Sequence, residues 1–159
     1  IESGQEVIDI HPVNLFRIAN ESISYVIGEI NDGMPEITLN VTEEIMVMGQ
    51  EEKISQVFVN LIQNASRFTR QNGLITITAK QYDNDIVEVS VSDTGMGIAP
   101  EHLAHVFERF YKVDRSRRDG GTGLGLSIVK HLVQAQGGEV FVDSVEGEGS
   151  TFKFTLPVA

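Results

Sequence analysis

The sequence contains no cysteine and no long run of apolar residues among its 159 residues. Without cysteine the chain forms no disulfide framework and no thiolate metal site, which is compatible with a reducing compartment but does not establish one. No apolar stretch approaches the roughly 20 residues that a membrane-spanning helix needs. A hydrophobic fraction of 41% and a charged fraction of 22% are near globular averages, so we expect one folded domain.

Basic residues are also scarce. The sequence contains twelve Lys and Arg and 23 Asp and Glu, which gives a formal net charge of -11. Such a charge repels phosphate backbones and anionic lipid, so we expect no nucleic-acid partner. A phosphate-bearing ligand would need local positive groups or a metal ion. The basic residues are in fact unevenly placed, because Lys112, Arg115, Arg117 and Arg118 crowd into one short stretch that Arg109 precedes.

The spacing of apolar residues predicts three helices and several short strands. The helices are expected from Pro12 to about residue 30, from about 50 to 68 and from about 124 to 136. The strands are expected at 37–41, 45–48, 74–79, 86–92, 140–144 and 150–156. Because hairpins dominate and no regular βαβ repeat occurs, we predict an α+β layer in which helices cover one face of a mixed sheet.

Residues 95–125 separate two of these strands from the third helix. This stretch is long and rich in glycine and charge. A loop of such length in a compact domain is usually functional, for example as an active-site lid.

Two asparagines, Asn60 and Asn64, lie four residues apart on the predicted second helix, so their amides project from the same face. Asparagine is a mediocre helix former, and its presence beside an apolar stripe needs a reason. One reading is that the amides satisfy buried backbone groups. The other is that Asn64 offers its carbonyl oxygen to a hard cation such as Mg²⁺.

A second polar segment, Asp93-Thr94-Gly95-Met96-Gly97, directly follows a predicted strand. A carboxylate at a strand end can accept a hydrogen bond from an exocyclic amine such as adenine N6. Gly95 and Gly97 permit close backbone approach and positive φ. An ordinary turn capped by the aspartate explains the same residues.

A third segment, residues 120–126 (GGTGLGL), leads into the last predicted helix. Free backbone N–H groups and the positive end of the helix dipole make such a start a ready anion site. The segment is neither a P-loop nor a GxGxxG dinucleotide fingerprint. Taken alone it is a weak indication.

Taken together, four segments resemble in order the motifs of one family. They are residues 51–69 (EEKISQVFVNLIQNASRFT, an N box), 93–98 (DTGMGI, a G1 box), 107–110 (FERF, an F box) and 121–126 (GTGLGL, a G2 box). The chain resembles the catalytic ATP-binding domain of sensor histidine kinases, within the superfamily of gyrase, Hsp90 and MutL-like ATPases. The resemblance implies a Bergerat fold, which is a two-layer sandwich in which three helices cover a mixed, mostly antiparallel five-stranded sheet. It also implies an ATP lid between the G1 and G2 boxes.

The resemblance also implies roles for individual residues, with ATP and Mg²⁺ as cofactors. Asn64 would coordinate Mg²⁺, Asp93 would bind adenine N6, and Asn60 and Lys112 would be the catalytic residues. The implied nucleotide-binding residues are Asn64, Arg67, Phe68, Asp93, Gly95, Gly97, Ile98, Tyr111, Lys112, Gly121, Thr122, Gly123, Leu124, Gly125 and Leu126.

One position favours a kinase over a hydrolase. Hydrolytic members of the superfamily carry a general-base glutamate one turn before the metal-binding asparagine, and here that position is Asn60. An amide has no useful proton affinity near neutral pH, so water attack is not promoted. Two alternatives stay open: a regulatory module that binds nucleotide without transfer, and a serine kinase of the anti-sigma type.

The phosphoacceptor is expected outside this chain. None of its four histidines, His11, His102, His105 and His131, lies in a motif like the family's His-Glu-Leu-Arg-Thr-Pro. The resemblance therefore implies two partners, the dimerisation and phosphoacceptor domain of the same kinase and a downstream response regulator. We expect the catalytic domain at residues 12–159, preceded by the remnant of an upstream linker at 1–11. We expect this domain to be a monomer when isolated. Its expected location is the cytoplasm of a bacterium, within a parent that in many family members is membrane-anchored.

Overall fold

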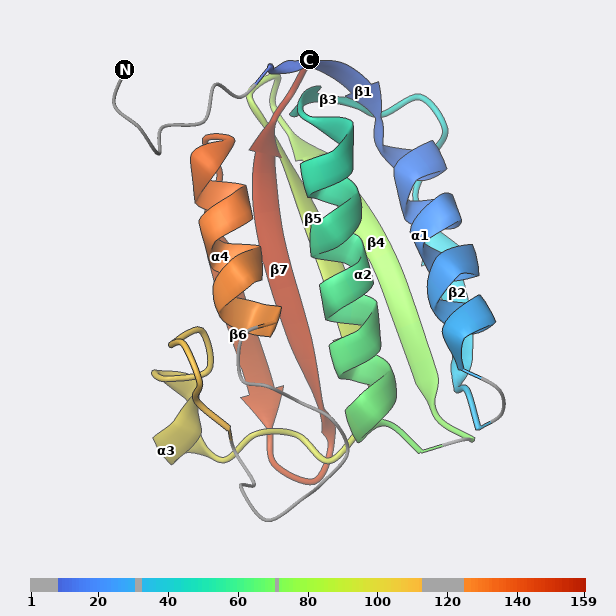
Figure 1. Cartoon of the computed structure of the whole chain (residues 1–159), viewed down its shortest axis with the longest axis vertical. Helices are drawn as coiled ribbons and strands as arrows, with labels where there is room; N and C mark the ends of the chain where they lie inside the picture. Colours follow the sequence, from blue (N-terminus) through green and yellow to red (C-terminus); the bar gives the residue numbers. More distant parts are fainter. Residues whose placement is uncertain (1–8, 31–32, 71, 113–124) are drawn as a thin grey trace.

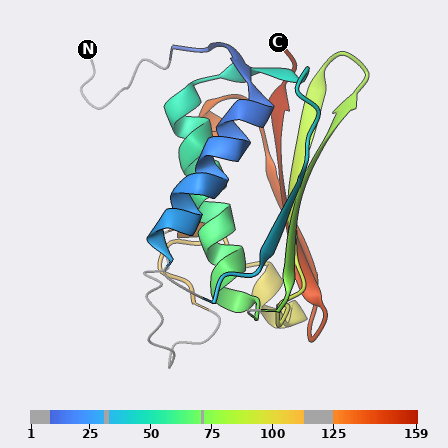
Figure 2. The ribbon, with the colours of Figure 1, turned by 90° about the vertical axis from the view of Figure 1, so that its right-hand side faces the viewer.

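A sheet and a layer of helices form the molecule, as the side view in Figure 2 shows. The computed structural model describes residues 9–30, 33–70, 72–112 and 125–159. The helices are α1 (Leu15–Glu29), α2 (Glu51–Phe68), α3 (Pro100–Leu103) and α4 (Gly125–Ala135). The strands are β1 (His11–Asn14), β2 (Glu36–Asn40), β3 (Met46–Gly49), β4 (Leu74–Tyr82), β5 (Ile86–Asp93), β6 (Val140–Val145) and β7 (Gly149–Pro157).

The main sheet has five strands in the order β2-β4-β5-β7-β6. Only β2 and β4 pair in parallel, and the other neighbours are antiparallel. The helices α1, α2 and α4 lie side by side across one face (Figure 1). The predicted α+β sandwich of five strands and three helices is therefore confirmed. The strand predicted at 45–48 is β3, which lies outside this sheet and pairs with β1 in a separate two-stranded sheet.

The core lies between the layer of helices and the sheet, with α2 packed over the central strand β5 and its neighbour β7. Every second residue of β5 is buried, because alternate side chains of a strand point to opposite faces of the sheet. The apolar face of α2 predicted from the sequence is buried against them. Phe58 of α2 meets Phe154 of β7 edge to face, with ring centroids 5.5 Å apart. This packing fixes the height and rotation of α2, and α2 carries both asparagines of the candidate site.

The start of the first helix differs from the sequence-based prediction. Pro12 lies in β1, opposite Met48 of β3, and α1 begins only at Leu15. The fixed φ of proline suits an edge strand as well as a first helical turn, so the residue alone does not separate the two. The side chain of Asn14 sets the start of α1, because it caps the helix by accepting a hydrogen bond of 2.9 Å from the Arg17 amide.

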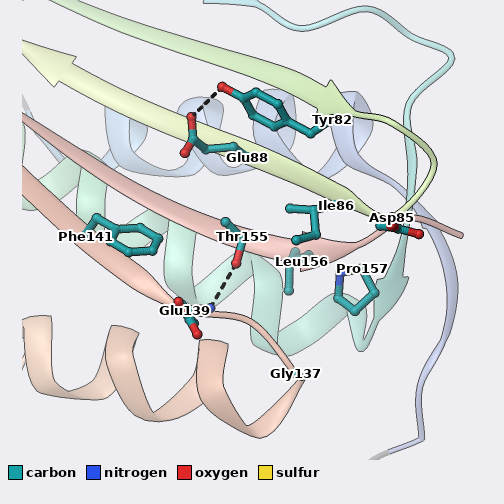
Figure 3. A pocket seen from close by; sticks show the side chains of 10 residues that line it. All are labelled: Tyr82, Asp85, Ile86, Glu88, Gly137, Glu139, Phe141, Thr155, Leu156 and Pro157. Carbon is teal, nitrogen blue, oxygen red and sulfur yellow. Dashed lines mark hydrogen bonds between the residues drawn. The ribbon is translucent and has the colours of Figure 1, made fainter.

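A hollow of about 380 Å³ lies at the end of the sheet where β5 begins. Tyr82, Ile86, Phe141 and Pro157 are among its lining residues (Figure 3). Ile86 and Asp93 stand at opposite ends of β5, about 23 Å apart at 3.3 Å per residue. The hollow is therefore separate from the site that the sequence predicts.

Candidate functional site

Asp93 is the last residue of β5, held between Ile75 of β4 and Ser150 of β7. It is only 9% exposed, and its Oδ1 accepts a hydrogen bond of 2.9 Å from the Gly95 amide. Burial raises the pKa of the Asp93 carboxyl, and backbone hydrogen bonds from Gly95 and Ser150 oppose that rise. A carboxylate has about four acceptor sites, so Asp93 keeps capacity for a further donor.

The loop after Asp93 is held on two sides. The Met96 amide donates to the carbonyl oxygen of Phe68, the last residue of α2, at 3.3 Å. On the other side, the Met96 carbonyl accepts from the Gly147 amide at 2.7 Å. The Ile98 amide donates to Ser144 Oγ at 2.7 Å. The loop is therefore fixed between the end of α2 and the β6–β7 hairpin.

The two glycines of this loop serve close packing. A Cβ on Gly95 would lie 2.4 Å from the Phe68 carbonyl oxygen, and one on Gly97 would lie 2.2 Å from the Val145 carbonyl oxygen. The predicted close approach is thus confirmed at both positions. Of the two glycines that permit a positive φ, Gly97 adopts one, at +72°, whereas Gly95 does not. Gly95 is needed because the backbone of α2 ends against it.

Asn60 connects α2 to the start of α4. Its Nδ2 donates to the carbonyl oxygen of Gly125 at 3.1 Å, and its Oδ1 accepts from Gln56 Nε2 at 2.6 Å. Asn60 therefore bonds to a backbone carbonyl, but that carbonyl belongs to an exposed residue and not to a buried one as the sequence-based alternative required. Gln56 was missed by the sequence reasoning, although its place four residues before Asn60 put it on the same helix face.

Asn64, one turn further along α2, is half-buried. Within the described part of the chain no hydrogen bond to its side chain is present. Arg67 and Phe68 occupy the last turn of the same helix, and both are half-buried. The residues predicted from the N box therefore line α2 from its middle to its C-terminal end.

The segment after α3 carries Tyr111, which contacts two histidines. The Tyr111 hydroxyl forms a hydrogen bond with His102 Nδ1, and its ring stacks on that of His105 with centroids 5.3 Å apart. Phe107 packs edge to face on Phe152 of β7, with centroids 6.0 Å apart. The F box therefore holds this segment to the sheet. Lys112 follows as the last described residue before a gap.

The G2 segment lies only partly within the described residues. Gly125 opens α4 and is exposed, while Leu126 is partly buried against the hydrophobic core. The predicted residues Gly121, Thr122, Gly123 and Leu124 lie outside the described residues, as do Arg115, Arg117 and Arg118.

Ser144 is a second residue that the sequence reasoning missed. Besides holding the Ile98 amide, its hydroxyl donates to the Gly149 carbonyl at 2.9 Å and lies 2.9 Å from Ser150 Oγ. It joins the hairpin to the loop that follows Asp93. No sequence spacing indicates it, because its partners are brought together by strand pairing.

The comparison with known families agrees with this geometry. Residues 49–159 match the family described as Histidine kinase-, DNA gyrase B-, and HSP90-like ATPase. That match covers more than half of the chain. The chain belongs to this family. Membership in this ATPase family implies that the domain binds nucleotide.

Sequence relatives within the ATPase family are sensor kinases. Sensor histidine kinase WalK of Bacillus subtilis is 43% identical over 117 residues, which are 72% of this chain and 19% of WalK. Adaptive-response sensory kinase SasA of Crocosphaera subtropica is 36% identical over 158 residues, which are 95% of this chain and 40% of SasA. The chain thus spans less than half the length of these curated relatives.

Solved structures of the family have the same fold. The mycobacterial sensor histidine kinase MprB aligns with a TM-score of 0.84 and 29% identity, over 93% of this chain and 98% of that chain. The catalytic domain of histidine kinase ThkA aligns with a TM-score of 0.80 and 29% identity, over 94% and 97%. Full-length ShkA in complex with AMPPNP aligns with a TM-score of 0.79 and 32% identity, over 97% and 32%. The predicted resemblance to histidine kinase catalytic domains is confirmed.

No helix in the described ranges is long and apolar enough to cross a lipid bilayer.

Proposed function

We propose that this chain is the catalytic domain of a sensor histidine kinase, which binds ATP with Mg²⁺ and transfers the γ-phosphate to a histidine on a separate dimerisation domain. One observation carries the proposal: α2 joins the two glycine segments. The Asp93 loop meets α2 at Phe68, and the start of α4 meets it at Asn60. These contacts are eight residues apart, about 12 Å along the helix. In this proposal the purine would lie at the Asp93 end and the polyphosphate at the α4 end.

The base end is Asp93. Its carboxylate is buried and rigidly placed, and it keeps acceptor capacity beyond the Gly95 amide. The chemistry of this acceptor fits the N6 amine of adenine, because an ionised acceptor forms a stronger hydrogen bond than a neutral one. Ile98 and Gly97 would shape the wall beside the base, and Phe68 and Tyr111 would supply aromatic surface.

The phosphate end is the N-terminus of α4. The backbone N–H groups of the G2 glycines and the side chains of Arg67 and Lys112 would supply the local positive potential that a triphosphate needs in a chain of net charge -11. Asn64 would be the protein ligand of Mg²⁺, which typically takes one or two protein oxygens together with substrate phosphates. When bound, the ion would neutralise charge on the phosphates. The complex of the related ShkA with AMPPNP supports a nucleotide in this site.

The hydrogen bonds of Asn60 favour transfer of the γ-phosphate over hydrolysis of ATP. The Asn60 amide donates to Gly125 and accepts from Gln56, so both of its polar atoms are already engaged and neither is a base. His102 and His105 are both engaged with Tyr111. In this proposal the acceptor histidine lies on the dimerisation and phosphoacceptor domain of the same kinase, and a response regulator would take the phosphate from there.

The test mixes this chain with the purified dimerisation domain of its own parent and with γ-labelled ATP and Mg²⁺. Acid-labile, base-stable label on that domain is the expected result. Bound ATP without any label would overturn the kinase assignment in favour of a regulatory module, and acid-stable label on a serine would favour the anti-sigma type of kinase. A failure of ATP to bind at all would reject the site itself.

A further inference from the structure

Three residues form a hydrogen-bonded chain from the surface of α2 to the start of α4. Gln56 Nε2 donates to Asn60 Oδ1 at 2.6 Å, and Asn60 Nδ2 donates to the Gly125 carbonyl at 3.1 Å. Gln56 is exposed, while Asn60 is half-buried. The two helices lie side by side in Figure 1, and this chain joins them at the end where α4 begins.

The direction of every bond in this chain is set by Gly125. A backbone carbonyl only accepts hydrogen bonds, so the atom of Asn60 that faces it must be Nδ2. Asn60 Oδ1 then faces Gln56, which must present its own NH₂ group. The Gln56 amide therefore holds the Asn60 amide in the one orientation that bonds to α4.

We propose that Gln56 is a positioning residue of the nucleotide site, which fixes the N-terminus of α4 against α2 through Asn60. This inference rests on the proposed function, because it assigns that helix start to the phosphates of ATP. The same helix α2 carries Asn64 one turn further on. Gln56 thus sets the spacing between the metal-binding residue and the phosphate-binding helix without touching the ligand itself.

Three variants of Gln56 separate donor capacity from charge. Gln56→Ala removes the donor and leaves the charge unchanged. Gln56→Lys keeps a donor and adds a positive charge, whereas Gln56→Glu offers only acceptors when ionised. Gln, Glu and Lys have similar helix propensities, and alanine has a higher one, so none of them breaks α2. Gln134→Ala is the matched control, because Gln134 is an exposed glutamine of α4 whose side chain makes no hydrogen bond within the described ranges.

The first measurement is amide hydrogen exchange over residues 125–129 without nucleotide. In Gln56→Ala and Gln56→Glu this first turn of α4 should exchange about three- to tenfold faster, the effect of losing one net hydrogen bond. Gln56→Lys should exchange like the wild type, and so should Gln134→Ala. The unfolding midpoint of Gln56→Ala should lie below that of Gln134→Ala by no more than the loss of this one hydrogen bond explains, and Gln56→Lys should recover it.

The second measurement is the affinity for ATP with Mg²⁺. Gln56→Ala and Gln56→Glu should bind about threefold or more weakly, and Gln56→Lys should restore binding. If lysine strengthens binding, glutamate weakens it and alanine changes nothing, charge alone acts and the inference is overturned. If residues 125–129 exchange at the same rate in all variants, the role of Gln56 is overturned as well, even where the wild type binds ATP normally. If the wild type binds no ATP, the proposed function fails, while the exchange data still decide whether Gln56 positions α4.

Discussion

A Cβ placed on Gly97 would lie 2.2 Å from the carbonyl oxygen of Val145. Gly97 belongs to the loop that follows Asp93, and Val145 is the last residue of β6. The loop therefore lies directly against the backbone of the β6–β7 hairpin. Since a backbone carbonyl cannot rotate away as a side chain does, this contact allows no side chain at position 97.

Gly97→Ala is expected to destabilise the domain. The residue has φ of +72°, a region that costs an L-residue roughly 1–2 kcal/mol, and the clash with Val145 adds to this cost. We expect a loss of about 2–4 kcal/mol in the free energy of unfolding, measured by urea denaturation.

Gly28→Ala is the matched control for that measurement. Gly28 lies in α1 and an added Cβ would meet nothing within 4 Å. Gly28 is the second-to-last residue of α1, so the change should leave the free energy of unfolding equal or raise it by less than the ~0.5–1 kcal/mol that is typical of a helix interior. Equal effects of the two substitutions would contradict the assigned contact between Gly97 and Val145.

The stability of the domain should depend on pH through Asp93. Its pKa in the folded state is raised from the ordinary value of 3.8, chiefly by burial. Between the unfolded and the folded pKa the native state binds more protons than the unfolded state, so stability falls as pH rises through that window. The free energy of unfolding of the wild type, minus that of Asp93→Asn, should therefore decrease from about pH 4 toward neutral pH and then level off. An increase would show that the hydrogen bonds from Gly95 and Ser150 outweigh burial.

Much of the fold follows from local sequence patterns. The alternation of apolar and polar residues in β5 and the apolar stripe of α2 each predict which face is buried, because side chains on one face recur about every 2 residues in a strand and every 3.6 in a helix. Two features did not follow in this way. Pro12 is compatible with a strand and with a helix start, and α3 lies inside the long stretch predicted as a lid.

The candidate site was predictable where its residues are close in sequence. Asn60 and Asn64 share a face because they are one turn apart, and Asp93 follows a recognisable strand. The contacts that hold the site are not local. Asn60 and Gly125 are 65 residues apart in sequence, and Ile98 and Ser144 are 46 apart. Such pairs depend on the register of the sheet and on helix packing, which no single segment encodes.

Asp93→Asn is expected to weaken ATP and ADP about equally. The adenine is common to both nucleotides, and the substitution replaces an ionised acceptor with a neutral amide. Hydrogen bonds to charged groups contribute about 1.5–3 kcal/mol, so the loss should be about tenfold or more. Calorimetric titration of both nucleotides provides the measurement.

The control for Asp93→Asn is Asp85→Asn, which makes the same change of charge in an exposed turn at the other end of β5. This variant should bind like the wild type. A loss confined to ATP in Asp93→Asn would place the carboxylate near the phosphates and would contradict its assignment to the base.

Asn64→Ala is expected to remove the dependence of ATP binding on Mg²⁺ while the fold persists. No hydrogen bond within the described ranges depends on this side chain, and alanine is the better helix former, so the free energy of unfolding should stay equal or rise by about 0.5 kcal/mol. ATP affinity measured with Mg²⁺ should fall to the value measured with EDTA, because the amide oxygen is the proposed protein ligand of the ion. Gln63→Ala, the preceding residue on α2, should retain the full difference between the two conditions. If Asn64→Ala retained it too, the ion would be held elsewhere and Asn64 would not be its ligand.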